Sequence, residues 1–260
     1  MKRCGLLTLA LVLAGCDYGA YFLRDVHVPM RALEVRVDPS ARRECLVVMM
    51  PGMFDVPDHY LENGFTDDAR AASDRCDFVA VDAHFGYYRD GTVRERVGGD
   101  ILRVASARGY SRVWLVGISM GGLGATLVAQ DHPGLVEGVI LLAPFLGDPA
   151  LIQSISDAGG LASWTSPETG PDEEHAFDDA LWGWLQGYVT HPDRMPRLYV
   201  GVGTEDELRP GVQLLADVLP ATQHGLAEGG HKWVTWRVLW QRLMASPPWD
   251  RGATAPRIDH

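Results

Sequence analysis

The chain has 260 residues, of which 47% are hydrophobic, and its formal net charge is −11 at pH 7. This length and composition suit a single α/β domain with a sizeable core, and they exclude a disordered or repetitive chain. The acidic balance, without clustered basic residues to neutralise phosphates, excludes nucleic acid as an expected partner.

The amino terminus has the pattern of an export signal. Met1-Lys2-Arg3 precedes an apolar run at residues 4–14, too short to be a stable transmembrane span. The run ends in Leu13-Ala14-Gly15-Cys16, which resembles the lipobox of bacterial lipoproteins. The resemblance implies that residues 1–15 are a signal peptide and that Cys16 carries a lipid anchor facing the periplasm. An ordinary signal peptide and an uncleaved anchor remain alternatives.

Cleavage at this place would remove two basic residues and no acids, so the formal charge would become −13 (−11 − 2). Membrane anchoring would then depend on lipid rather than on charge. Asp17 looks like the residue that favours retention at the inner membrane in enterobacterial lipoproteins.

Cleavage would discard Cys4 and acylation would occupy Cys16, leaving Cys45 and Cys76. Both come just before apolar strands that we expect to be parallel neighbours, so in an oxidising compartment we predict a disulfide between them. Two separate buried thiols are the alternative. No Cys-x-x-Cys pattern or close histidine pair accompanies them, so we expect no metal site.

Strand and helix patterns alternate after a predicted tether at residues 16–32. Expected strands cover residues 33–37, 46–50, 78–82, 112–116, 136–142, 198–202 and 222–226. Expected helices cover residues 58–73, 92–108, 211–219 and 234–244, with one more from the Gly-x-Ser-x-Gly turn to about residue 132. The run at 46–50 is apolar on both faces, which is typical of a central parallel strand. We therefore predict a mostly parallel sheet flanked by helices.

About fifty residues separate two of these strands, which is long for a connection and predicts a cap at residues 147–196. Its tryptophans could line a pocket for an apolar acyl group. Equally, four residues at helical spacing could bury the cap on the core: Leu181, Trp182, Leu185 and Tyr188. Residues 82–90 are expected to be mainly a structural loop with a hydrogen-bonded His84, although they could shape a pocket. Residues 246–260 contain three prolines and are predicted to be a loose tail.

The pattern Gly-x-Ser-x-Gly at residues 117–121 follows an apolar strand and precedes a helical pattern. This context predicts a nucleophile elbow, in which Ser119 occupies a strained corner and small glycines avoid collisions. The Met120 N–H, at the start of the helix, would point at the same place and could bind an oxyanion. A tightly packed glycine turn without chemistry is the alternative, because the bare pattern recurs by chance in roughly one such sequence in ten.

Candidate acid and base residues follow later in the chain. Asp206 is the preferred acid after the strand at 198–202, with Glu205 and Glu207 as competitors and a solvated acidic loop as the alternative. His231 follows two glycines in a loop before the last helix, a position that suits a general base. His224 is the alternative base, within a predicted strand.

The order Ser119, Asp206, His231 resembles that of the α/β-hydrolase superfamily, and the resemblance covers residues 33–245. In that superfamily a pair such as His-Gly follows the strand at 46–50, and a backbone N–H just beyond it is the second oxyanion donor. Pro51-Gly52 resembles the pair, so the resemblance implies that Met53 donates. Gly-Gly-His-x-Trp and Gly-x-x-Asp look most like bacterial esterases.

The resemblance implies a serine esterase or lipase-like enzyme for small or medium acyl groups, working through a catalytic triad and an acyl-enzyme. It implies no metal and no organic cofactor. Two alternatives remain: a thioesterase or acyltransferase acting on an envelope lipid or glycan, and a non-catalytic envelope lipoprotein that uses the hydrolase fold for binding. The motifs set neither the natural substrate nor the oligomeric state.

Overall fold

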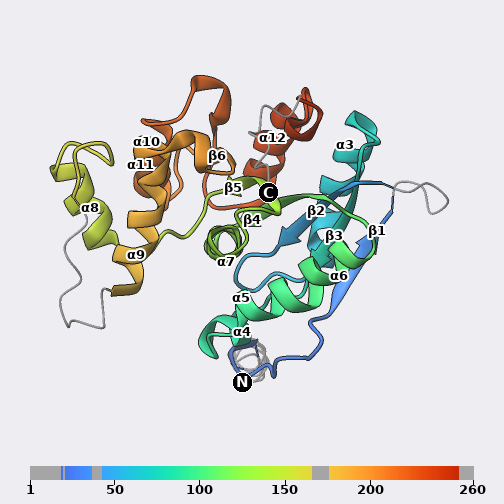
Figure 1. The fold of residues 1–260 in the computed structure, drawn as a ribbon. Helices are drawn as coiled ribbons and strands as arrows, with labels where there is room; N and C mark the ends of the chain where they lie inside the picture. The colour runs from blue at the N-terminus through green and yellow to red at the C-terminus, as the bar shows by residue number, and fades with distance from the viewer. Residues whose placement is uncertain (1–18, 20, 37–42, 166–175, 252–260) are drawn as a thin grey trace, which may run out of the picture.

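The computed structural model describes residues 19, 21–36, 43–165 and 176–251. Cys16 and the predicted signal peptide lie outside the described residues. Within these residues the strands form one seven-stranded sheet in the order β1-β3-β2-β4-β5-β6-β7 (Figure 1). β1 runs antiparallel to β3, and all other neighbours are parallel. The predicted mostly parallel sheet is therefore confirmed.

The strands begin and end close to the predicted positions. They are β1 (Ala32–Val35), β2 (Cys45–Met50), β3 (Cys76–Val81), β4 (Arg112–Ile118), β5 (Val136–Leu142), β6 (Arg197–Gly203) and β7 (His224–Ala227). All residues of β2 and β3 are buried, as are all of β4 except its first. These strands form the centre of the core because helices cover both of their faces.

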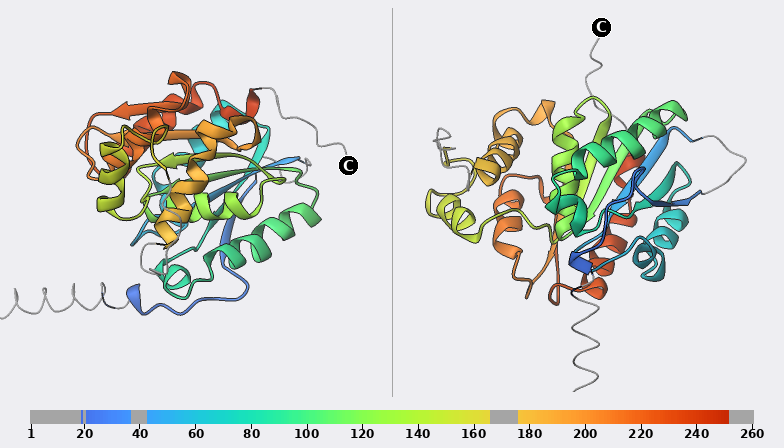
Figure 2. Two further views of the ribbon diagram at one scale, coloured as in Figure 1. Left: turned by 60° about the vertical axis from the view of Figure 1, so that its left-hand side comes forward. Right: turned by 90° about the horizontal axis from the view of Figure 1, so that it is seen from below.

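The helices before β5 are α2 (Asp58–Glu62), α3 (Phe65–Ala72), α4 (Phe85–Arg89), α5 (Val93–Arg96), α6 (Arg103–Ala107) and α7 (Met120–Asp131). Those after it are α8 (Pro149–Asp157), α9 (Ala176–Leu185), α10 (Gly187–Thr190), α11 (Arg209–Ala216) and α12 (Trp233–Met244). Helices α3 and α12 cover one face of the sheet, and α5, α6 and α7 cover the other (Figure 1). Figure 2 shows α8 to α11 gathered at one side of the molecule and β1 at the other. No helix in the described ranges is long and apolar enough to cross a membrane.

Two predicted helices are interrupted. The helix expected at 58–73 divides into α2 and α3 at Gly64, whose φ of 72° ends α2 in a left-handed conformation. The helix expected at 92–108 contains a π-helical turn, Val97–Leu102, between α5 and α6. Two adjacent glycines fall in that turn, and their low helix propensity allows the register to change there.

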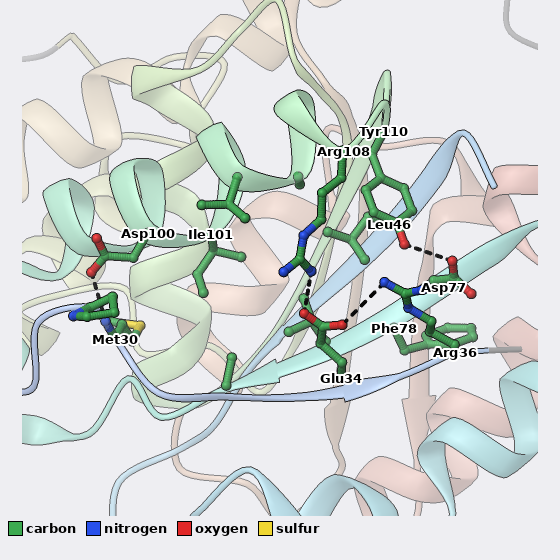
Figure 3. Close-up of a pocket in the computed structure, with 15 residues that line it drawn as sticks. Met30, Glu34, Arg36, Leu46, Asp77, Phe78, Asp100, Ile101, Arg108 and Tyr110 are labelled. Carbon is green, nitrogen blue, oxygen red and sulfur yellow. Dashed lines mark hydrogen bonds and ion pairs between the residues drawn. The ribbon is translucent and has the colours of Figure 1, made fainter. Parts of the chain in front are cut away.

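A pocket of about 340 Å³ lies between β1, β3 and the helix that contains the π-helical turn (Figure 3). Its charged side chains already have partners: Glu34 contacts both Arg36 and Arg108, and the Tyr110 hydroxyl donates to Asp77 at 2.8 Å. Burial, together with this hydrogen bond, raises the pKa of Tyr110 to about 12.

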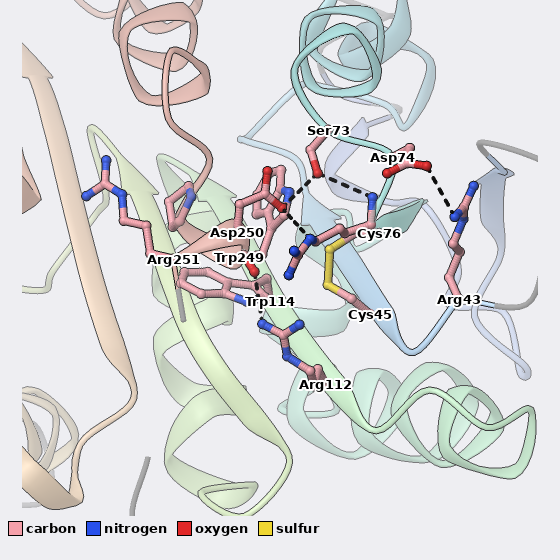
Figure 4. Close-up of polar contacts among 12 residues, drawn as sticks. Arg43, Cys45, Ser73, Asp74, Cys76, Arg112, Trp114, Trp249, Asp250 and Arg251 are labelled. Atoms are coloured by element: carbon pink, nitrogen blue, oxygen red, sulfur yellow. Dashed lines mark hydrogen bonds and ion pairs between the residues drawn. A yellow bond between two sulfur atoms is a disulfide. The ribbon is translucent and has the colours of Figure 1, made fainter. Parts of the chain in front are cut away.

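The predicted disulfide between Cys45 and Cys76 is confirmed (Figure 4). These residues begin β2 and β3 and face each other in the parallel register, with their Cα atoms 4.4 Å apart. The bond therefore joins two central strands at their amino ends.

The prediction of a loose tail is wrong for residues 246–251. Trp249 is only 1% exposed, and its ring packs 6.1 Å from that of Trp114. The guanidinium of Arg112 donates to the Trp249 carbonyl at 3.0 Å (Figure 4). Burial of the indole outweighs the irregular, proline-rich local sequence. Residues 252–260 lie outside the described part.

Part of the predicted tether also packs on the domain. Met30 is buried, the Arg24 guanidinium contacts Asp82 at 2.8 Å, and the His27 N–H donates to the Tyr87 hydroxyl at 3.0 Å. Residues 21–31 are therefore attached to the fold before the first strand begins.

The connection between β5 and β6 carries α8, α9, α10 and a 3-10 turn, Pro192–Arg194. The four residues predicted at helical spacing are all buried: Leu181, Trp182, Leu185 and Tyr188. The Trp182 indole donates to the Leu146 carbonyl at 2.9 Å. Of the two alternatives for these residues, the structure supports burial of the segment on the core.

Candidate active site

Ser119 lies between β4 and α7 in a strained turn. Its φ and ψ are 53° and −119°, a conformation that residues with a Cβ adopt at a cost. A Cβ at Gly117 would lie 2.3 Å from the Gly121 carbonyl oxygen, and one at Gly121 would lie 2.0 Å from that of Met50. Only glycine fits at both positions, which explains why the serine is flanked by the two glycines.

Both residues predicted to donate to an oxyanion lie beside this turn. Met120 is the first residue of α7, where the helix dipole places partial positive charge. The loop after β2 passes close to the serine, because a Cβ built on Gly52 would lie 3.4 Å from Ser119 Cβ. Met53 is the next residue along this loop.

The structure brings His231 and Asp206 together. His231 Nδ1 lies 2.9 Å and 3.1 Å from the two Asp206 carboxylate oxygens, and the Asp206 side chain is fully buried. The Leu208 N–H also donates to this carboxylate at 3.0 Å. The competing acids Glu205 and Glu207 are exposed. Geometry therefore favours Asp206 among the three acids as the partner of a histidine.

Of the two candidate bases, His224 is exposed at the first residue of β7, whereas His231 follows the carboxyl end of that strand. The two glycines before His231 permit a close approach to the loop that carries Asp206. A Cβ at Gly203 would lie 2.2 Å from the Gly229 carbonyl oxygen, and Gly229 has a φ of 115°. The Glu205 N–H donates to the same carbonyl at 2.9 Å, so backbone contacts join the two loops.

Ser119, Asp206 and His231 each follow the carboxyl end of a parallel strand: β4, β6 and β7. Such ends meet at one edge of a sheet, where ligand sites of open α/β sheets are usually found. If the Nδ1–H of His231 donates to Asp206, its Nε2 is left to accept a proton from a serine hydroxyl. The arrangement can therefore support nucleophilic chemistry at Ser119.

Comparisons with known proteins agree with this architecture. A family model described as serine aminopeptidase, S33, matches residues 100–179. No curated protein matches the chain. Among solved structures, an S-formylglutathione hydrolase from Staphylococcus aureus is 15% identical with a TM-score of 0.54, covering 85% of this chain and 97% of its own.

Two further structures are similar over most of their length. Est1E from Butyrivibrio proteoclasticus is 16% identical with a TM-score of 0.53, covering 83% of this chain and 92% of its own. A membrane phospholipase A described as a bacterial virulence factor is 22% identical with a TM-score of 0.51, covering 97% and 100%. The protein has the α/β-hydrolase fold. The family-model match contains Ser119 and α7 but neither Asp206 nor His231.

One residue of the candidate site has no counterpart among the sequence predictions. The Asp55 carboxylate accepts a hydrogen bond from the Trp233 indole at 2.9 Å and contacts His59 Nδ1 at 2.7 Å. The Asp55 N–H donates to the Gly52 carbonyl at 3.2 Å. Asp55 thus joins the loop after β2 to the segment that follows His231. No spacing rule connects an acid and a tryptophan so far apart in sequence, so no sequence signal identified this contact.

Beneath the site, the Tyr60 hydroxyl donates to the Met50 carbonyl at 2.8 Å. Complete burial raises the pKa of Tyr60, so it stays a neutral donor at physiological pH. This bond fixes Met50, the last residue of β2. The same carbonyl oxygen is the atom that a Cβ at Gly121 would contact.

His84, which the sequence placed in a structural loop, is fully buried, and its Nδ1 accepts the Gly86 N–H at 3.1 Å at the start of α4. Burial lowers the pKa of His84, so the ring is neutral in the folded protein at neutral pH. These contacts give His84 a structural role. The pocket in Figure 3 is lined by none of Ser119, Asp206 and His231, so it is separate from the candidate active site.

Proposed function

We propose that the protein is a serine hydrolase that cleaves carboxylic esters of small or medium acyl groups. The observation that carries the proposal is the contact between His231 Nδ1 and the buried Asp206, at the same edge of the sheet as the strained Ser119. This arrangement combines a strained, half-buried serine as nucleophile, a base and a group that orients the base.

In the proposed reaction, His231 accepts the Ser119 proton as the serine oxygen attacks the acyl carbon, and then returns it to the leaving alcohol. Asp206 holds the imidazole in the useful tautomer and stabilises its charged form. The N–H groups of Met120 and Met53 bind the oxyanion, where loss of one donor raises the barrier by about 3 kcal/mol. Water then attacks the acyl carbon while His231 takes its proton, and His231 returns that proton to the Ser119 oxygen as the carboxylic acid leaves.

Apolar side chains around Ser119 support an acyl substrate. Met53, Phe54 and Phe145 are 39%, 43% and 41% exposed. Phe145 lies beside the turn, because its N–H donates to the Ser119 carbonyl at 2.9 Å. Two of the proteins of similar fold are described as esterases, one a ferulic acid esterase and the other a carboxylesterase, which agrees with ester chemistry.

The lipobox-like sequence supports a second part of the proposal, that Cys16 carries a lipid and anchors the protein in the envelope, facing the periplasm. Metabolic labelling with an alkyne fatty acid tests this directly. The label is expected on the native chain and not on Cys16→Ser, and equal labelling of both contradicts the anchor.

The decisive test of activity is turnover of a chain-length series of p-nitrophenyl esters. We expect Ser119→Ala and His231→Gln to abolish turnover, while Ser106→Ala and His224→Gln retain it, because both control residues are exposed away from the turn. A fluorophosphonate should label the native protein and not Ser119→Ala. Unchanged turnover in Ser119→Ala, or absence of both turnover and labelling in the native protein, refutes the serine hydrolase.

A thioester substrate is the second candidate, because two proteins of similar fold are described as S-formylglutathione hydrolases. The test compares an oxygen ester and a thioester that carry the same acyl group. A kcat/KM that favours the oxygen ester supports the proposal, and a strong preference for the thioester replaces it. Adding a long-chain alcohol in the same assay detects acyl transfer as a new ester product.

A further inference from the structure

Four aromatic rings from three separate segments form a cluster beside the candidate active site. We define the aromatic cluster as Tyr21, Phe22, Phe54 and Phe85. The Phe54 ring lies 4.8 Å from that of Tyr21 and 5.4 Å from that of Phe22, and the Phe22 and Phe85 rings are 5.1 Å apart. The Tyr21 hydroxyl accepts the Phe85 N–H at 3.3 Å. The amino-terminal segment is therefore held against both the loop after β2 and α4.

This cluster presents apolar surface to solvent. Phe22 is 36% exposed, Phe54 is 43% exposed, and the neighbouring Leu23 is 77% exposed. Single exposed apolar residues are common on proteins, but contiguous ones mark a binding surface. The surface continues into the site, because Phe54 directly follows Met53. Apolar surface therefore borders the place where an ester would reach Ser119.

The chain that leaves this cluster leads to the predicted membrane anchor. Tyr21 is five residues after Cys16, and a fully extended chain of that length spans at most about 17 Å. The apolar run at 4–14 lies just upstream, so an uncleaved anchor would impose a similar limit. Either kind of anchor would hold the aromatic cluster within a short distance of the bilayer surface.

We propose that the aromatic cluster and Leu23 rest on a lipid bilayer, and that the esters cleaved at Ser119 are acyl esters of membrane lipids. The second half rests on the proposed function. Aromatic rings are suited to the interface between water and lipid. The chain is acidic overall, so the contact depends on apolar side chains rather than on attraction to anionic lipids, and salt should change it little.

The bilayer contact can be tested on the full, lipidated chain in vesicles of phosphatidylcholine. With Cys45 and Cys76 joined in a disulfide and Cys16 acylated, Leu23→Cys supplies a reactive thiol for an environment-sensitive dye. Ser106→Cys, on the exposed surface of α6, is the matched control. We expect a nitroxide lipid to quench the dye at position 23 and aqueous iodide to quench it at position 106.

Quenching at position 23 by iodide to the same extent as at position 106 overturns the proposal. If neither quencher reaches the dye at position 23 and a cross-linked dimer forms, the bilayer proposal is also overturned. The aromatic cluster would then be a contact between two copies of the chain. Because quenching needs no catalysis, this result is independent of whether Ser119 is the nucleophile.

The substrate half is tested by comparing two esters in one variant. Leu23→Ser should lower hydrolysis of a long-chain glycerol ester embedded in vesicles about fivefold, because one exposed apolar contact with lipid is lost. Turnover of a soluble short-chain ester should be retained. An equal fall with both esters, or no fall with the embedded ester, overturns the substrate assignment. Failure of the proposed function itself appears differently, as soluble turnover that survives Ser119→Ala.

Discussion

The hydrogen bond between Trp233 and Asp55 offers a quantitative test of how the site is held together. It joins the loop after β2 to the residues that follow His231, at 2.9 Å, and the Asp55 side chain is only 13% exposed. Trp233→Phe removes the indole N–H while keeping an aromatic ring against Tyr60. The variant therefore breaks the bond and retains most of the packing.

A hydrogen bond to a charged group contributes about 1.5 to 3 kcal/mol to stability. Asp55 keeps its contact with His59 at 2.7 Å, so we expect the lower end, about 1.5 kcal/mol. The smaller ring adds its own packing loss, which a double-mutant cycle with Asp55→Ala separates from the bond. If the bond also positions His231 relative to the loop after β2, kcat should fall about tenfold in Trp233→Phe with little change in KM.

The assay is urea unfolding of the native protein, the two single variants and the double variant, followed by ester hydrolysis. Trp249→Phe is the control, because its buried indole N–H has no hydrogen-bond partner in the described part of the chain. It should lose packing energy and keep kcat. Additive effects of Trp233→Phe and Asp55→Ala on unfolding, or an unchanged kcat in a folded Trp233→Phe, would refute the reasoning.

Three further predictions concern stability. Gly121→Ala places a Cβ 2.0 Å from the Met50 carbonyl oxygen, so it should lower the free energy of unfolding by about 3 kcal/mol, and an unchanged melting curve contradicts this. Cys45→Ala with Cys76→Ala opens a crosslink spanning 31 residues and should cost about 3 to 4 kcal/mol in urea unfolding, an effect that a reducing agent should reproduce on the native protein. Burial lowers the pKa of His84, so below about pH 6.5 the unfolded state binds a proton that the folded state does not. As the pH is lowered below about 6.5, the free energy of unfolding should therefore decrease by up to about 1.4 kcal/mol per pH unit, and His84→Asn should reduce this slope.

The sequence was most informative where one local pattern determines one element. The strand at 136–142 has the predicted bounds because its apolar run is bounded by turn residues on both sides. The disulfide between Cys45 and Cys76 was predictable because both cysteines precede strands of the same kind, and parallel neighbours align their amino ends. Gly117 likewise follows from sterics within the turn, whereas Gly121 is required by the carbonyl of Met50 in the neighbouring strand, and the motif records both positions.

Contacts between distant segments were not predictable. Trp249 follows two prolines and has no periodic neighbours, so nothing local indicates that its indole packs against Trp114. Asp55 lies in an irregular loop and acquires its partner from α12 only when the sheet has formed. The division between α2 and α3 was a different case, since Asn63-Gly64 is a recognised turn signal that helical periodicity on either side obscured.

The carboxy-terminal contacts have a practical consequence for handling the protein. Arg112 and Arg197, which begin β4 and β6, both donate to the segment that contains Trp249, so the described chain finishes at the amino edge of the sheet. Ser119 lies at the opposite edge, one seven-residue strand or about 20 Å away. An affinity tag or a sensor surface attached beyond Arg251 would thus hold the molecule by its far side and leave both the serine turn and the aromatic cluster facing the solution.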